Sequence, residues 1–145
     1  MDLSDNTALH TAWCFAEALD RDDFVAAEGL LAEACTYVSP SGVIDGAAEI
    51  IASYRGNSEW AHRTFDNIEF DSEVALIDPS DSSRFLITYT DRTNHKGQRH
   101  EYRCCQIVTV GHDGKIVHIK HEEIPGEREK LEAYLKEVGV TREGS

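Results

Sequence analysis

Basic residues are scarce in this sequence: 14 Lys and Arg stand against 27 Asp and Glu, which gives a formal net charge of −13. Proteins that bind nucleic acid or anionic lipid use clustered Lys and Arg to displace counterions from the phosphates. A chain with this charge is repelled by both surfaces. We therefore expect neither nucleic acid nor a membrane among its partners.

Long hydrophobic runs are absent as well. No segment approaches the ~20 consecutive apolar residues that span a bilayer. Residues 1–12 carry two aspartates, no Lys or Arg and no apolar run, so they do not resemble a secretory signal. We expect a cytoplasmic protein.

The four cysteines lack the CxxC spacing that is typical of metal-binding and redox motifs. They lie in apolar or strand-like contexts, which favours reduced, buried thiols over a disulfide framework. Cys104 and Cys105 are neighbours in a predicted strand, where successive side chains point to opposite faces. A redox role is the less favoured interpretation.

The length of 145 residues and the hydrophobic content of 41% fit one domain, residues 1–145, with a single core. Near the N-terminus, apolar residues recur at three- and four-residue spacing. They predict a first helix, from Ser4 or Asp5 to Asp20, that buries one face. The residues of that face are Leu9, Ala12, Trp13, Ala16 and Leu19.

Two further helices are predicted before residue 60. Asp22 or Asp23 caps the second helix, and the third opens at residues 45–46 and ends at Gly56. The β-branched and aromatic segment 36–38 predicts a short strand between them. A Pro-Ser-Gly turn ends this strand.

From residue 64 the hydrophobic period changes to two, which is typical of strands with one polar face. Turn signals divide this part of the chain into four strands that form an antiparallel meander. The strands centre on residues 68–76, 85–89, 99–110 and 116–123. A last amphipathic helix is predicted over 127–137, followed by Gly139.

Four segments carry a family resemblance. They are the helix end from Phe15 to Asp23, Leu30-Leu31 before a strand that ends at residues 39–42, the helix from Gly46 to Asn57, and the hairpin 112–117. Together, in an α+β order of helices and then a meander, they resemble the nuclear transport factor 2-like superfamily. Its SnoaL-like and ketosteroid isomerase-like branches are the most similar.

The resemblance implies a cone-shaped α+β barrel, with three N-terminal helices packed on a strongly bent, mostly antiparallel sheet and a short C-terminal helix. It also implies a deep internal cavity and a homodimer made through the sheet. Activities in the family range from isomerisation and cyclisation to plain ligand binding. The fold alone does not decide among these functions.

Three positions depart from the ketosteroid isomerase-like pattern. Ser39 stands where those members carry the carboxylate that acts as general base, and Phe15 stands where they carry a phenol on the first helix. Gln106 matches their buried acid and could still donate a hydrogen bond. The resemblance therefore does not bring that mechanism of steroid isomerisation to this chain.

Strand alternation selects the side chains that face the expected cavity. In the last strand, Val117, Ile119 and His121 are predicted to face inward and Ile116 outward. The even-numbered residues of 100–110 and the odd-numbered residues of 85–91 share the inward face. The residues expected to line the cavity are Tyr37, Ser39, Tyr54, Trp60, Tyr89, His100, Tyr102, Cys104 and Glu123.

His121 is the candidate general acid/base, because imidazole titrates near neutral pH and burial tunes its pKa. Asp91 or Glu123 would orient it, while Gln106 and Tyr54 would polarise a substrate carbonyl. We predict His121, Asp91 and Gln106 as catalytic residues of an isomerase or cyclase that needs no cofactor. Its partner would be a small, largely apolar molecule with a carbonyl or a hydroxyl.

Other interpretations stay open at this point. His121 is equally compatible with a wall or dimer-interface histidine, and Asp91 precedes a hairpin, where solvated aspartates are common. The domain would then be a non-catalytic ligand-binding or dimerisation module. A metal site is not expected, because a strand sends His118 and His121 to opposite faces.

Overall fold

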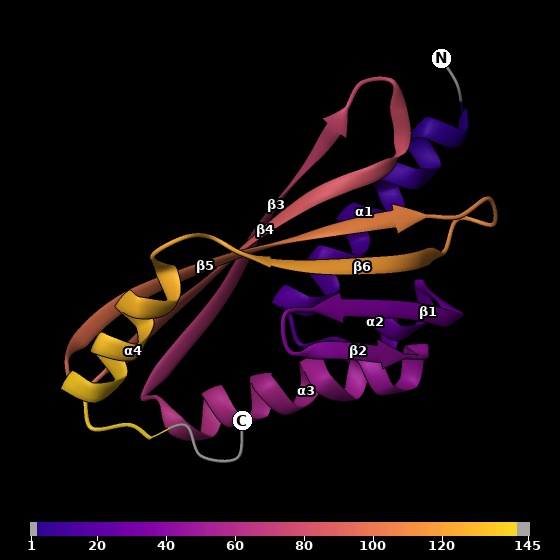
Figure 1. Cartoon of the computed structure of the whole chain (residues 1–145). Coiled ribbons are helices and arrows are strands. Elements are labelled where there is room, and N and C mark those ends of the chain that lie inside the picture. Colours follow the sequence, from indigo (N-terminus) through magenta and orange to yellow (C-terminus); the bar gives the residue numbers. More distant parts are fainter. Residues whose placement is uncertain (1–2, 142–145) are drawn as a thin grey trace.

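Six strands form one strongly curled sheet that the helices partly enclose (Figure 1). The computed structural model describes residues 3–141. The elements are α1 (Leu3–Asp20), α2 (Phe24–Gly29), β1 (Leu31–Ser39), β2 (Gly42–Asp45), α3 (Ala47–Thr64), β3 (Asn67–Asp78), β4 (Asp81–His95), β5 (Gln98–Val110), β6 (Ile116–Glu123) and α4 (Glu127–Glu137). The predicted α+β class, with helices first, then a bent sheet and a C-terminal helix, is confirmed.

The four strands β3 to β6 pair in sequence order, and each of these pairings is antiparallel. This is the predicted meander. β1 adds to β6 in parallel and β2 pairs with β1, so the strand order is β2-β1-β6-β5-β4-β3. The sequence does not predict β2, because its four residues are mostly exposed and carry no alternating pattern.

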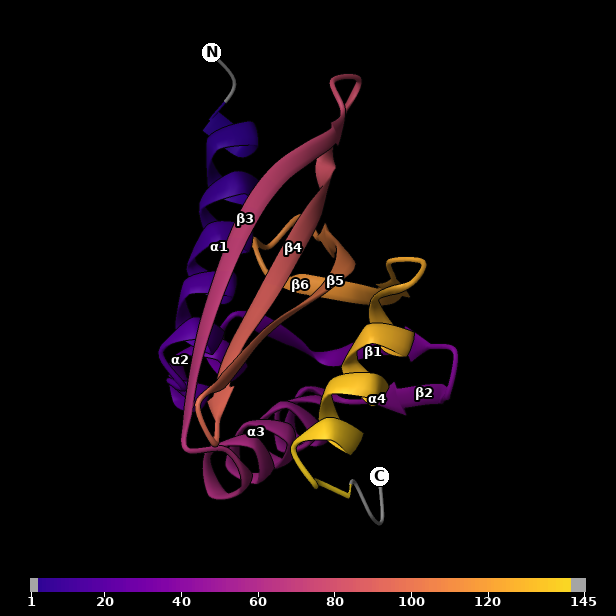
Figure 2. The same cartoon turned by 90° about the vertical axis from the view of Figure 1, so that its left-hand side faces the viewer.

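The helices pack on the strands of the sheet. α1 packs along β3 and β4, α3 packs against β1, and α4 packs against β5 (Figure 2). No helix in the described part of the chain is both long and apolar enough to cross a membrane. The buried apolar residues of α1, among those with described side chains, are Ala8, Ala12, Phe15, Ala16, Ala18 and Leu19.

The predicted inward face of α1 is therefore partly wrong. Leu9 and Trp13 are 44% and 56% exposed, whereas Phe15 is fully buried. Two neighbouring apolar stripes run along this helix, and spacing alone does not choose between them. The stripe that contains the alanines lets the helix approach the sheet closely, so Trp13 faces outward.

Two aspartates hold the turn between α1 and α2. Asp23 caps α2 by accepting a hydrogen bond from the backbone N–H of Ala26 at 3.1 Å, as predicted for one of the two candidate caps. Asp22 has a positive φ of 57°. Its carboxylate accepts a hydrogen bond from Ser58 at 2.5 Å and contacts His62 at 2.8 Å, which ties the turn to α3.

α3 continues through Gly56 to Thr64, so the predicted stop at Gly56 is wrong. Glycine inside a helix costs about 1 kcal/mol relative to alanine. The last turns bury Ser58 and Ala61, and this tertiary burial outweighs the local cost. The extension brings Trp60 into the structure as a helical residue.

β6 contains a bulge at Val117, which has no partner in the register with β5. The extra residue turns Ile116 into the core, where it is fully buried, and leaves Val117 39% exposed. The predicted inward Val117 and outward Ile116 are therefore wrong. Beyond the bulge, Ile119 is buried and His121 keeps the inward face.

A second hydrophobic cluster lies under α4 and is separate from the main core. Its buried members are Ala61, Phe65, Ile68, Tyr134, Leu135 and Val138. The hydroxyl of Tyr134 donates to the carbonyl of Gln98 at 2.8 Å, which fastens α4 to β5. α4 spans the predicted residues, and Gly139 follows it with a φ of 75°.

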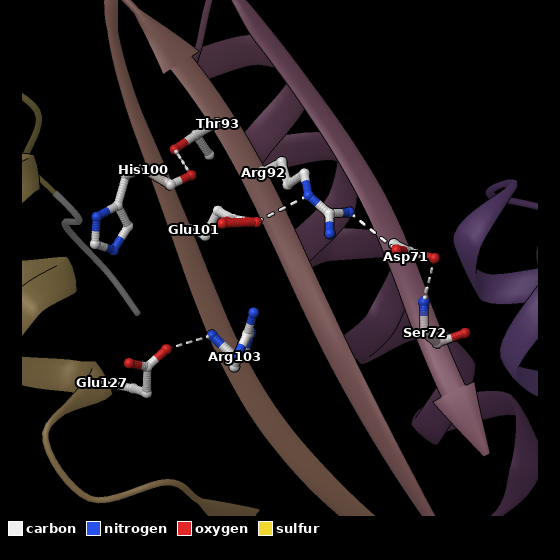
Figure 3. A network of polar contacts seen from close by, with 8 residues as sticks. All are labelled: Asp71, Ser72, Arg92, Thr93, His100, Glu101, Arg103 and Glu127. Carbon is white, nitrogen blue, oxygen red and sulfur yellow. Dashed lines mark hydrogen bonds and ion pairs between the residues drawn. The ribbon is translucent and has the colours of Figure 1, made fainter.

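The outer face of the sheet carries an exposed ion-pair network (Figure 3). Arg92 on β4 donates to Asp71 on β3 at 3.0 Å and to Glu101 on β5 at 2.9 Å. Beside it, Glu127 of α4 accepts a hydrogen bond from the backbone N–H of Arg103 at 2.8 Å. Exposed ion pairs add at most about 1 kcal/mol each, so this network contributes little to fold stability.

We expect Ile119→Ala to lower the free energy of unfolding by about 2–5 kcal/mol, because it leaves a void in a fully packed core. Val117→Ala should cost less than about 1 kcal/mol, since the bulge exposes that side chain. Urea unfolding of both variants measures the difference. Equal losses would contradict the bulge, because plain alternation puts both residues on one face.

Candidate functional site

The curled sheet and the helices surround a cavity of about 1010 Å³. Apolar side chains such as Leu19, Ile50 and Phe70 make up much of its wall, with a smaller number of polar groups between them. The wall includes every residue proposed from the sequence: Tyr37, Ser39, Tyr54, Trp60, Tyr89, Asp91, His100, Tyr102, Cys104, Gln106, His121 and Glu123. A largely apolar cavity with a few polar groups is typical of small-molecule sites.

Gln106 joins the polar groups at the centre of this wall. It is only 3% exposed. Its Oε1 accepts a hydrogen bond from the hydroxyl of Tyr54 at 2.6 Å, and its Nε2 donates to the oxygen of Tyr37 at 3.3 Å and to Nδ1 of His121 at 3.2 Å. Gln106 and His121 are direct cross-strand partners on β5 and β6. The polar atoms of Gln106 are thus occupied by protein groups.

His121 is held as a neutral imidazole. Because Nδ1 accepts the hydrogen bond from Gln106, the ring proton lies on Nε2. Burial lowers the pKa of His121, and this effect exceeds the opposing influence of the Glu123 carboxylate. The ring stacks near Tyr37, with centroids 6.4 Å apart and planes at 27°.

Three partly buried tyrosines with protonated hydroxyls line the cavity. Burial raises the pKa of Tyr37 to about 12 and raises the pKa values of Tyr54 and Tyr89 well above the ordinary 10. The Tyr54 proton is donated to Gln106. Tyr37 accepts from Gln106, so its own O–H remains available to a ligand.

The two carboxylates proposed to orient His121 are placed differently. Glu123 accepts a hydrogen bond from Nε of Arg128 at 2.6 Å and is held by that guanidinium. Asp91 lies on β4, and β5 separates that strand from His121 on β6. Gln106 hydrogen-bonds the imidazole directly, and the Glu123 carboxylate acts on it electrostatically.

His100 lies on the cavity wall beneath α4. Its ring stacks on Tyr134, with centroids 4.8 Å apart and planes at 16°. Burial lowers its pKa, and its Nε2 is buried without a hydrogen-bond partner among the described residues. The contact with α4 gives His100 a packing role that its position on a polar strand does not reveal.

Asp20 is a cavity residue that the sequence interpretation missed. It ends α1 and lines the wall, and Ser72 on β3 donates to its Oδ2 at 2.6 Å. Burial raises the pKa of Asp20 to about 6, opposed by the Ser72 hydrogen bond and assisted by Asp71 and Glu17. An acid in the last turn of a helix lies at the negative end of the helix dipole, which is unfavourable. This unusual placement could have marked Asp20 in the sequence as a candidate site residue.

The cavity thiol is protonated. Cys104 lines the wall, and burial raises its pKa to about 12. Cys105 contacts Thr88 at 3.7 Å on the opposite face, as strand alternation predicts. All four cysteines are free, but only Cys35 is buried, and the expected burial does not hold for the partly exposed Cys14, Cys104 and Cys105.

A curled sheet that encloses a polar-centred cavity with its helices defines an α+β cone of the nuclear transport factor 2-like superfamily. Residues 14–119 match the family model of the SnoaL-like domain. The chain belongs to this family, and the resemblance drawn from the sequence is confirmed. No curated protein matches the chain significantly in sequence.

Solved structures share the fold at low identity. A candidate polyketide cyclase from Xanthomonas campestris pv. campestris is 17% identical, with a TM-score of 0.65 over 92% of this chain and 97% of that chain. An LEH-like epoxide hydrolase from M. tuberculosis is 18% identical, with a TM-score of 0.64 over 94% and 96%. RV0760c from Mycobacterium tuberculosis, in complex with estradiol-17beta-hemisuccinate, is 14% identical, with a TM-score of 0.61 over 83% and 96%.

We expect Asp20→Asn to stabilise the protein at pH 7.5. The folded pKa of Asp20, about 6, lies above its ordinary value of 3.8. Its contribution to stability is therefore present below pH 4 and is lost as the pH rises through 6. Asparagine avoids that loss and can still accept the hydrogen bond from Ser72.

Urea unfolding of wild type and Asp20→Asn between pH 3.5 and pH 8 measures this difference. The advantage of the variant should appear between about pH 4 and pH 6 and then stay constant. A variant that is less stable than wild type at pH 7.5 would contradict the raised pKa.

Proposed function

We propose that the cavity binds a small, largely apolar molecule with a carbonyl or a hydroxyl group, and that His121 exchanges a proton with it. The protein would then be an isomerase or cyclase that needs no cofactor. The observation that supports this most directly is the hydrogen bond from Gln106 to Nδ1 of His121 in the cavity wall. It holds a neutral imidazole beside an available Tyr37 hydroxyl.

A ligand oxygen in front of this group would meet two donors, Nε2–H of His121 and O–H of Tyr37. Such donors stabilise the negative charge that develops on a carbonyl oxygen during enolisation. The imidazolium that forms when His121 takes the carbon-bound proton can then pass a proton to that oxygen, so the C–H bond is replaced by the O–H bond of the enol and the imidazole returns to its neutral form. This assigns the carbonyl contact to His121 and Tyr37, because Gln106 and Tyr54 bond to each other.

Removal of the carbon-bound proton needs an imidazole that can accept this proton on Nε2. Rotation of the Gln106 amide by half a turn provides this state, since Oε1 then accepts from a protonated Nδ1 of His121. Tyr37 would donate to Oε1 and Tyr54 would accept from Nε2, because a hydroxyl can fill either role. The same four side chains can therefore hold His121 either as a hydrogen-bond donor to the ligand oxygen or as the base that takes the carbon-bound proton.

The relatives support the kind of ligand proposed here. RV0760c binds estradiol-17beta-hemisuccinate, a largely apolar molecule with oxygen groups. A candidate polyketide cyclase shares the same fold. At these identities the relatives do not determine the reaction, which is inferred from the Gln106 and His121 geometry alone.

The second candidate function is a non-catalytic binding module. The saturation of the Gln106 amide by Tyr37, Tyr54 and His121 favours it, since a fully bonded amide also serves to hold the fold together. The position of Glu123 favours it too, because that carboxylate pairs with Arg128 and its influence on His121 is smaller than the effect of burial, so the pKa of His121 is lowered. Turnover of a ketone separates the two functions.

We expect the wild-type protein to accelerate deuterium incorporation next to the carbonyl of 2-tetralone, a small apolar ketone, in D2O. His121→Ala should lower the enzyme-dependent rate by about 100-fold, because it removes the proton-exchanging group. Proton NMR of the ketone follows the exchange. His118→Ala is the matched control, since His118 lies on the opposite face of the same strand.

Two results would count against the catalytic proposal. An undiminished rate in a folded His121→Ala variant would remove His121 from the mechanism. Binding of 2-tetralone to wild type without any accelerated exchange would leave the binding module as the function.

The family resemblance also implies a homodimer made through the sheet, and we propose that its outer face forms the contact. This face presents the exposed network of Asp71, Arg92 and Glu101 (Figure 3). Light scattering should give a mass of twice 16.2 kDa, and Arg92→Glu should lower it by opposing the two carboxylates. A monomeric wild type at micromolar concentration would contradict the dimer.

A further inference from the structure

Carboxylates outnumber guanidinium groups on the cavity wall. Four of the lining residues are carboxylates and one is a guanidinium: Asp20, Asp22, Asp91, Glu123 and Arg128. The guanidinium of Arg128 is already paired with Glu123. The chain as a whole carries −13, so the wall disfavours anionic ligands and favours cationic ones.

Asp20 has a carboxylate oxygen without a hydrogen-bond partner among the described residues. Asp22 is held by Ser58 and His62. Asp20 accepts a hydrogen bond from Ser72 on Oδ2, but its Oδ1 is buried and has no hydrogen-bond partner among the described residues. A buried carboxylate oxygen without a partner is costly, and a cation brought by a ligand would remove that cost.

The charges around Asp20 also favour the binding of a cation. Glu17 on α1 and Asp71 on β3 are close enough to raise its pKa. The cation nearest to Asp71, Arg92, is engaged by Asp71 and Glu101 on the outer face. Arg21 pairs with Glu17 at 3.8 Å, so this cation is engaged as well, and Asp20 itself forms no ion pair among the described residues.

Aromatic rings accompany this carboxylate. Ser72, which holds Asp20, is the direct cross-strand partner of Tyr89. The hydroxyl of Tyr89 is likewise buried without a hydrogen-bond partner in the described part of the chain. Tyr37 and Tyr54 stand beside it on the wall, edge to face with centroids 6.0 Å apart. A carboxylate next to electron-rich rings is the usual setting for a bound ammonium group.

We propose that the ligand carries a basic amine, bound in its protonated form between Asp20 and Tyr89. The ammonium would donate to Oδ1 of Asp20 and approach the oxygen and ring of Tyr89, with small side-chain rotations that expose these buried atoms. This inference rests on the proposed function for the cavity itself. It narrows the ligand to a largely apolar amine with an oxygen group that reaches His121.

Three probes that differ in one group test the proposal: 2-naphthylmethylamine, 2-naphthalenemethanol and 2-naphthoate. Calorimetry with the full chain at pH 7.5 should show the amine binding at least about tenfold tighter than the alcohol. The carboxylate should bind more weakly than the alcohol. The alcohol reports on the proposed binding function independently of the amine.

Asp20→Asn should bring the affinity for the amine down to that for the alcohol, while the alcohol stays within about twofold of wild type. Glu69→Gln makes the same charge change at an exposed position of β3, the strand that supplies Ser72, and should keep the preference. Wild type should also lose affinity for the amine from pH 7.5 to pH 5, as Asp20 gains its proton. The affinity of Asp20→Asn for the amine should not fall over this pH range.

Each remaining outcome has a definite meaning. If the carboxylate binds as tightly as the amine, or if Asp20→Asn weakens all three probes alike, the amine proposal is overturned while the binding cavity stands. If none of the probes binds, the proposed binding function fails for ring systems of this size, and the amine proposal fails with it.

Discussion

The amide of Gln106 has to be satisfied by protein groups, because it lies almost without exposure in the wall of the cavity. A buried polar group without a partner costs about 1–3 kcal/mol. Its partners come from three elements: Tyr37 from β1, Tyr54 from α3 and His121 from β6. The need to satisfy this one amide therefore ties the helical half to the sheet and places the imidazole at the cavity.

The parallel pairing of β1 with β6 makes this arrangement possible. Tyr37 is the register partner of Ile119, two residues before His121 on the same face. The N-terminal helices thereby reach the strand that carries the candidate acid/base. The bulge at Val117 has a matching effect, since it turns Ile116 into the core and leaves the inward face beyond it undisturbed.

Burial moves the titrating groups of the cavity toward their neutral forms. It lowers the pKa of His121 and raises the pKa values of Tyr37, Tyr54 and Cys104. The wall thus offers neutral donors on the side of Gln106. Asp20 provides a contrast, because a pKa of about 6 lets it carry a charge at neutral pH at some cost in stability. A neutral pole and an acidic pole in one cavity suit a ligand with two different polar ends.

The sequence by itself determined the α+β class, the meander of four strands, the last helix and the inward side chains of β5. These features follow from a period of two, from turn residues and from helix stops, all of which act over a few neighbouring residues. The cavity residues on β5 and the inward His121 could be predicted for the same reason.

Only the tertiary structure decided the rest, because it depends on contacts between distant residues. Gly56 stays helical because later turns of α3 find buried positions, and Trp13 faces outward because an alanine stripe packs more closely on the sheet. Gln106 finds Tyr54 at a separation of 52 residues, and Asp20 finds Ser72 at the same separation. No local pattern encodes such pairings, and they decide which polar groups are left for a ligand.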